Sequence, residues 1–205
     1  DRFDFWRLPF SDLGMPHTAS GHPKYVSFAL FLINMASSSA IMISFARVCR
    51  FTPAMPHREW KALLSIVAAA GFVIGIFPHG RFHYVHMFGC ALMVGALWFL
   101  GNVFTIELRD AGKSRAVLLV QLVLQLTVLP YAVSYALEAD SRQALQKLAI
   151  IGLFVSLSLA TRALRQAALE TAFHVSKVSA SAARVRDPNG ATADGGFLGR
   201  SQKMT

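Results

Sequence analysis

Charged residues are what this sequence has least of. Only 15% of its 205 residues are Asp, Glu, Lys or Arg, whereas 54% are hydrophobic. A soluble domain usually carries about 25% charged residues, so this composition is typical of an integral membrane protein. The formal net charge of +9 does not indicate a nucleic-acid partner, because the basic residues lie between apolar runs and form no basic stripe interleaved with aromatic residues.

Cysteine and catalytic motifs are also scarce. Cys49 and Cys90 show no CxxC spacing, so neither a disulfide framework nor a structural zinc site is indicated. The sequence contains no HExxH, GxSxG, P-loop or dinucleotide fingerprint. No acid or base lies in the middle of a long apolar run, where a proton or ion pathway would need one. A non-enzymatic role is therefore favoured, and no cofactor is required.

Long apolar runs are what the sequence has instead. A membrane-crossing helix needs about 20 predominantly apolar residues. We predict an all-α, polytopic transmembrane helical bundle with five spans, or six if a further helix precedes residue 1. In the fifth span Lys147 and Arg162 are expected to extend their charges to opposite interfaces. The predicted spans are 25–46, 62–78, 83–106, 116–137 and 145–164.

The basic residues predict the orientation of these spans. Most Lys and Arg follow the first, third and fifth runs. By the positive-inside rule, segment 1–24 is then external and the C-terminus is cytoplasmic. A bacterial inner membrane and a eukaryotic endomembrane both fit. Good helix formers over 166–186 predict a cytoplasmic or interfacial helix, and 187–205 is an extended polar tail with little to bury.

Small and polar residues indicate how the spans contact one another. Lipid gives helices no hydrophobic drive to associate, so close packing relies on small residues and on interhelical hydrogen bonds. Gly71 and Gly75 have GxxxG spacing, and Ala91 and Gly95 form a second small pair. Polar groups inside the spans are either interhelical contacts, which we favour, or the lining of a substrate route. They are Asn34, Gln121 and Gln125.

The stretch "PHGRFHYVHMFG", residues 78–89, suggests a turn followed by a helix. His83 and His86 are three residues apart on that helix and, with Asp12 of the external segment, are the candidate metal ligands. His86 is also a candidate haem or chlorin ligand. We favour an interfacial position for His83 and a hydrogen bond between His86 and a polar group elsewhere, most simply in the "FSDLG" loop.

Two motifs suggest a family. "LPFSDLG", followed by a helix that starts "KYVSFALF", and "FPHGRFHYVHMFGCA" together resemble six-helix membrane proteins of the Frag/DRAM/Sfk type, or a similar bacterial family of uncharacterised proteins. The resemblance covers about residues 8–165. It implies a six-helix bundle with both termini in the cytoplasm. The matching positions would be Ser11, Asp12 and Gly14 in the loop motif and His86, Gly89 and Cys90 in the histidine motif.

The function predicted from these features is that of a non-catalytic integral membrane protein, a structural or accessory subunit of a larger membrane complex, with energy-transducing complexes among the candidates. We expect the lipid bilayer and other membrane subunits as partners, and a partner that holds the tail 187–205. Two alternatives stay open. One is a lipid-modifying enzyme with an outer-face His/Asp site, and the other is a haem- or chlorin-carrying subunit that binds through His86.

Overall fold

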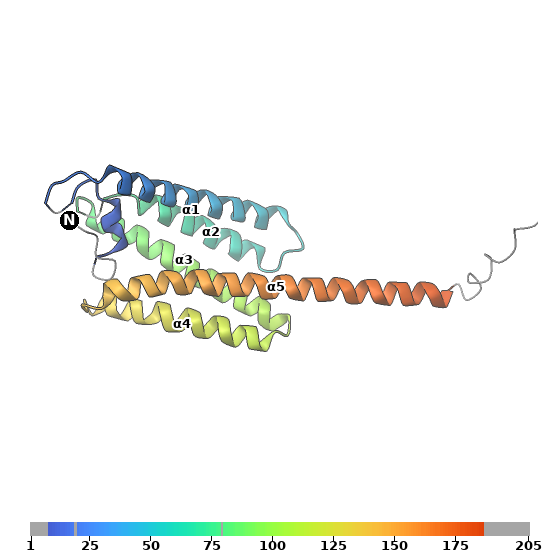
Figure 1. Ribbon diagram of the computed structural model, residues 1–205. Helices are drawn as coiled ribbons and strands as arrows, with labels where there is room; N and C mark the ends of the chain where they lie inside the picture. The colour runs from blue at the N-terminus through green and yellow to red at the C-terminus, as the bar shows by residue number, and fades with distance from the viewer. Residues whose placement is uncertain (1–7, 19, 79, 187–205) are drawn as a thin grey trace, which may run out of the picture. The chain divides into compact units, whose positions relative to one another are not determined.

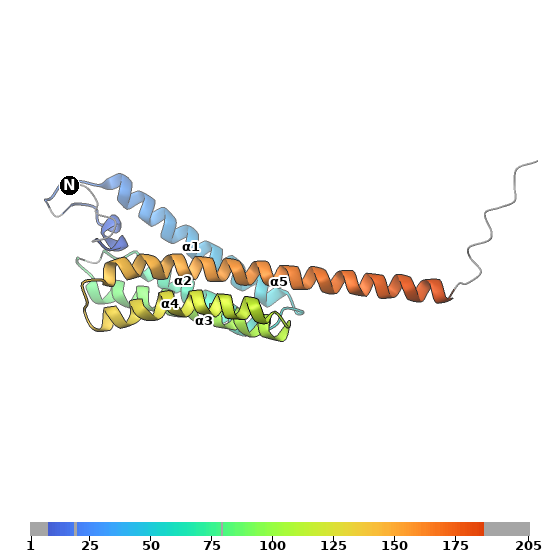
Figure 2. The ribbon, with the colours of Figure 1, turned by 60° about the horizontal axis from the view of Figure 1, so that its bottom comes forward.

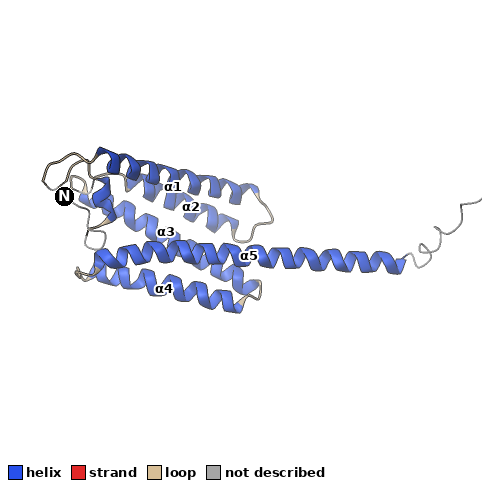
Figure 3. Ribbon diagram, viewed as in Figure 1, coloured by secondary structure: helices blue, strands red, loops and turns tan. Residues whose placement is uncertain are grey.

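The computed structural model describes residues 8–18, 20–78 and 80–186. Over these residues the chain is helical and contains no β-strand (Figure 3). The prediction of an all-α fold is confirmed. A short 3-10 helix is followed by five α-helices: η1 Phe10–Gly14, α1 Tyr25–Phe51, α2 Arg58–Ile74, α3 His83–Asp110, α4 Ser114–Ala136 and α5 Arg142–Arg186.

Four helices are long and apolar enough to cross a membrane: α1, α3, α4 and the part of α5 over Arg142–Phe173. Many large apolar side chains on these helices are exposed, for example Leu30 at 62% and Phe154 at 66%, as expected for a surface that faces lipid. α2 differs, since its 17 residues span only about 25 Å and begin with charged side chains. That α2 crosses the membrane stays a prediction.

The boundaries of α2 differ from the predicted span 62–78. The helix begins at Arg58 and ends at Ile74. The amide of Gly75 still bonds the carbonyl of Gly71, four residues back, as in an α-helix. The helix ends there because the next amides, of Ile76 and Phe77, bond the carbonyls of Val73 and Ile74, only three residues back, which is the pattern of a turn. The apolar run continues into this turn, so hydropathy alone places the helix end too late.

Helices α1 to α4 lie side by side in chain order, with α2 between α1 and α3 (Figures 1 and 2). The first part of α5 packs on α3 and α4. One core cluster joins these three helices near the α3–α4 turn, and a second lies nearer the α4–α5 turn. The first contains Leu100, Phe104, Leu108, Val120 and Ala160; the second contains Leu124, Val128, Ala149 and Leu153.

The chain divides into two compact units after Leu164. The first holds η1, helices α1 to α4 and the first part of α5. The second begins at Arg165, and its described part is the remainder of α5 to Arg186. The helix expected over 166–186 is therefore a continuation of the fifth helix. The tail 187–205 lies outside the described residues, so the expected partner for it stays a prediction.

Glycines set the distance between α2 and α3. A Cβ added at Gly71 would lie 2.5 Å from the backbone nitrogen of Met93, and one added at Gly89 would lie 2.6 Å from the backbone nitrogen of Gly75. The two backbones are thus in direct contact. By contrast, a Cβ at Gly95 would meet nothing within 4 Å, and Ala91 is exposed. Among the described residues, Gly95 of the pair predicted for α3 therefore makes no close contact, and Gly89 is the glycine of α3 that contacts α2.

Candidate functional site

Two buried charges form an ion pair between α2 and α3. Lys61 lies in the first turn of α2 and Glu107 in the last turn of α3, with side chains only 4% and 5% exposed. The Lys61 ammonium group contacts Oε1 of Glu107 and lies 5.0 Å from the centre of the Phe104 ring. Ala46, Cys49 and Ala62 form a buried apolar cluster at the same end of the bundle. Each charge is therefore neutralised by its partner and not by water.

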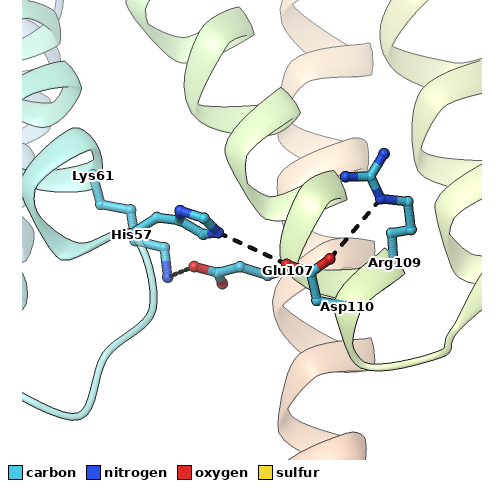
Figure 4. Close-up of polar contacts among 5 residues, drawn as sticks. All are labelled: His57, Lys61, Glu107, Arg109 and Asp110. Atoms are coloured by element: carbon cyan, nitrogen blue, oxygen red, sulfur yellow. Dashed lines mark ion pairs between the residues drawn. The ribbon is translucent and has the colours of Figure 1, made fainter.

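A second set of charges surrounds this pair at the surface (Figure 4). Nε2 of His57 lies 3.9 Å from the Asp110 carboxylate, and Nε of Arg109 lies 3.9 Å from the same group. These side chains are 39% to 72% exposed. Exposed pairs at such distances contribute about 0–1 kcal/mol. Of these ion pairs, the buried contact of Lys61 with Glu107 contributes most to holding α2 against α3.

Sequence reasoning missed this ion pair. Lys61 immediately precedes the predicted span 62–78 and Glu107 immediately follows the predicted span 83–106, positions where charges normally face water or headgroups. The 45 residues between them contain no pattern that links one to the other. One signal for an unusual role was available in the sequence: Glu107 is the only acidic residue in the third apolar run before Asp110.

An amide network joins α3 to α4. Nε2 of Gln121 donates to Oδ1 of Asn102 at 3.0 Å, and Nε2 of Gln125 donates to Oε1 of Gln121 at 2.8 Å. The indole of Trp98 donates to Oε1 of Gln125 at 3.1 Å. The two glutamines therefore serve as interhelical contacts, and their shared partner Asn102 was not singled out from the sequence.

Asn34 has a different environment from these glutamines. It is exposed on α1, ten residues into a 27-residue apolar helix. Within the part of the chain that the structure describes, its amide makes no hydrogen bond. Ser37, one turn further on, is also exposed. If α1 crosses the membrane, this polar group would face hydrocarbon, which costs several kcal/mol unless a partner satisfies it.

The loop that contains η1 is fixed at its backbone carbonyls. Nζ of Lys24 donates to the carbonyl of Asp12 at 2.5 Å, and Oγ of Ser27 donates to that of Leu13 at 3.1 Å. Nζ of Lys147 donates to the carbonyl of Leu8. Ser11 and Asp12 are half-buried in η1. These contacts dock the loop on α1 and α5.

The position of Lys147 differs from the expected one at the membrane interface. Its side chain is not extended to the interface but fully buried, with 0% exposure. Its ammonium group lies 5.4 Å from the centre of the Phe10 ring, and the amide of Phe10 bonds Oε1 of the neighbouring Gln146 at 3.3 Å. The loop covers Lys147 and supplies the carbonyl that stabilises its charge. The hydropathy of the fifth run carries no information about that cover.

His86 is buried at the first turns of α3. Its Nδ1 lies 3.0 Å from the carbonyl oxygen of Phe77, in the turn after α2, and its Nε2 lies 3.4 Å from Sγ of Cys90. Because a carbonyl only accepts, Nδ1 carries the proton in the neutral ring, and the Cys90 thiol donates to Nε2. The contact ties His86 to its own helical hairpin. A haem or chlorin would have to displace Cys90 to reach Nε2.

The candidate metal ligands are not brought together as a metal site. His83 is exposed and its ring lies edge-on to Tyr84, whereas His86 is buried and Asp12 is in η1. Among the described residues, no group of three His, Cys, Asp or Glu side chains has the arrangement needed to hold a metal ion. The expectation that His83, His86 and Asp12 bind a metal together therefore gains no support from the geometry.

We expect His86→Ala to destabilise the bundle, by about 1–3 kcal/mol, because it removes a buried imidazole and its hydrogen bond to the Phe77 carbonyl. Thermal unfolding of the detergent-solubilised chain measures this effect. His83→Ala is the matched control, since the His83 ring is exposed, and its unfolding temperature should stay within the error of the wild type. Equal effects of the two substitutions would show that the contact with Phe77 contributes nothing.

No protein-family model, curated protein or solved structure matches this chain. The resemblance to six-helix membrane proteins therefore stays a prediction.

Proposed function

We propose that this chain is a non-catalytic integral membrane protein that works as a structural or accessory subunit of a larger membrane complex. In this proposal all five helices cross the membrane, with the η1 end outside and the α1–α2 and α3–α4 turns on the cytoplasmic side. The distribution of basic residues supports this orientation, since Arg109, Lys113 and Arg115 cluster at the α3–α4 turn.

The observation that carries the proposal is the exposed polar face of α1. Asn34 and Ser37 lie in the apolar part of this helix without covering side chains. They belong to a stripe of exposed residues that recurs every three and four positions, the spacing of a helix–helix seam. We call this stripe the α1 seam; it consists of Leu30, Asn34, Ser37, Ile41, Ser44 and Val48.

A neighbouring transmembrane helix on the α1 seam explains both features. Small serine side chains allow two helix backbones to approach, and the Asn34 amide can donate and accept across the contact. Lipid provides neither a closely packed backbone nor a hydrogen-bond partner for this amide. α1 is also available for such a contact, because its packing partners within the chain are α2, η1 and a few side chains of the core on one side.

Cross-linking in intact membranes tests the proposal. A photo-activatable residue at Ser37 should yield a product of higher mass, because that position faces the neighbouring helix. The matched control is Ala36, which is also exposed and lies at nearly the same depth but about 100° around α1. Products at both positions, or at neither, would contradict a specific contact through the α1 seam.

We further expect Asn34→Leu to weaken this association about 3- to 30-fold, since one interhelical hydrogen bond contributes roughly 0.6–2 kcal/mol. The yield of the Ser37 cross-link measures the loss. Thermal unfolding of the purified variant should be unchanged, because the Asn34 side chain makes no hydrogen bond to described residues of its own chain. A variant that cross-links as well as the wild type would remove Asn34 from the interface.

A further inference from the structure

An open hollow of about 230 Å³ lies between α3 and α4. Its wall combines two apolar side chains with an amide pair, a hydroxyl group and one arginine. These residues are Asn102, Thr105, Ile106, Arg109, Val117 and Gln121. A volume below the usual 300–1,000 Å³ of small-molecule pockets accommodates only part of a larger ligand. If the helices cross a membrane, the molecules that reach this hollow are lipids.

The position of the hollow along α3 matches the headgroup end of a lipid. With 28 residues, α3 is about 42 Å long, close to the 40–45 Å of a bilayer including its headgroups. Arg109, one residue from the end of α3, therefore lies at the level of lipid phosphates. Asn102 is two turns, or about 10 Å, deeper. A lipid beside α3 thus places its phosphate at Arg109 and its ester groups toward the amides.

Arg109 retains the capacity to bind a phosphate. Its side chain is 72% exposed, and Figure 4 shows it on the side of α3 that faces α4. Asp110 lies 3.9 Å from Nε, too far for a hydrogen bond, and its carboxylate also faces His57 at 3.9 Å. A guanidinium group has five N–H donors in a fork that matches phosphate oxygens.

The deeper wall of the hollow offers a donor to an ester carbonyl. Nε2 of Gln121 uses one hydrogen on Asn102, and Oε1 of Gln121 accepts from Gln125. An amide nitrogen has two hydrogens, so the second of Gln121 is left for a ligand. The hydroxyl of Thr105 donates to the carbonyl of Gly101 at 2.9 Å and can still accept.

We propose that this hollow binds one glycerophospholipid of the cytoplasmic leaflet. Arg109 binds the phosphate, the free N–H of Gln121 binds an ester carbonyl, and the first part of an acyl chain packs on Ile106 and Val117. The proposal rests on the membrane orientation given above but not on the α1 seam. The binding assay uses the purified chain alone. A failure of the lipid proposal therefore does not imply a failure of the α1 seam, and the reverse also holds.

Native mass spectrometry of the full chain in mild non-ionic detergent tests the ligand class. Dioleoylphosphatidylglycerol should form a one-to-one adduct. Dioleoylglycerol, which lacks the phosphate, should bind at least about 10-fold more weakly, because a charge-assisted hydrogen bond is lost. Inorganic phosphate should form no adduct. Equal binding of the two lipids would overturn phosphate recognition, and an adduct with phosphate alone would show an anion site and not a lipid site.

Substitutions in the wall of the hollow test whether the lipid binds there. Arg109→Gln should weaken lipid binding about 10-fold, and Val117→Trp should weaken it at least as much by filling the hollow. Arg115→Gln removes the same charge from the adjoining turn, outside the wall, and should change binding less than 2-fold. Equal losses in Arg109→Gln and Arg115→Gln would show general attraction to anionic lipid instead. Unaltered binding in a Val117→Trp variant with wild-type thermal unfolding would exclude the hollow.

Discussion

Glu107→Leu is expected to destabilise the bundle by about 3–5 kcal/mol, because it leaves the Lys61 ammonium group buried without a counter-charge. Both side chains are at most 5% exposed, so water does not replace the lost carboxylate. The cation–π contact with the Phe104 ring is already present in the wild type and contributes only about 1–2 kcal/mol, so it does not replace the lost counter-charge. Denaturant unfolding of the chain in mixed micelles measures the difference.

The double variant Lys61→Leu/Glu107→Leu separates a lost charge pair from a general loss of packing. Two buried apolar side chains of similar size often replace an ion pair at no net cost, so we expect the double variant to recover most of the wild-type stability. Glu59→Leu is the control, because the contact of Glu59 with Arg58 is exposed and its loss should change stability by less than about 1 kcal/mol. A double variant as unstable as Glu107→Leu would refute the charge argument.

Gly89→Ala is expected to separate α2 from α3 and to destabilise the bundle by about 3 kcal/mol or more. The new methyl group would lie 2.6 Å from the backbone nitrogen of Gly75 and 2.8 Å from the carbonyl carbon of Ile74. Overpacking usually costs about 1–3 kcal/mol when side chains can adjust. Here the obstacle is backbone, so the helices themselves must move. Unfolding in mixed micelles again gives the magnitude.

Gly95→Ala is the matched control for this prediction. Gly95 lies on the same helix, but a Cβ there meets nothing within 4 Å. Alanine favours a helix by up to about 1 kcal/mol over glycine, so Gly95→Ala should leave stability unchanged or raise it. The two substitutions are chemically identical and should therefore have effects of opposite sign. A destabilised Gly95→Ala variant would mean that this face contacts something outside the chain.

The two predictions concern different ways of holding α2 in place. Gly71 and Gly89 let α2 and α3 touch through their backbones near the turn that joins them, whereas Lys61 and Glu107 join the opposite ends of the same helices. α2 is the shortest of the five helices, and it lies between α1 and α3. Both contacts thus compensate for the small apolar surface that a 17-residue helix contributes.

The helices themselves were predictable from the sequence. Their number and approximate limits follow from apolar run lengths, because a helix satisfies its backbone hydrogen bonds within its own segment. The turn at Pro78 and Gly80 and the interhelical use of Gln121 and Gln125 follow from equally local patterns. Errors occurred where an apolar run continued past the helix end, as at Ile74.

The partners of individual side chains were decided only by the tertiary structure. Which face of a helix meets its neighbour depends on the rotation of each helix about its axis, and run lengths leave that rotation undetermined. That rotation places Gly89 against α2 and leaves Gly95 open, although both are glycines of the same helix. It also brings Lys61 to Glu107 across 46 positions and lets the η1 loop cover Lys147. The sequence thus determined the helices and their apolar surfaces, while packing between distant segments determined which polar groups are paired and which, like Asn34, stay exposed.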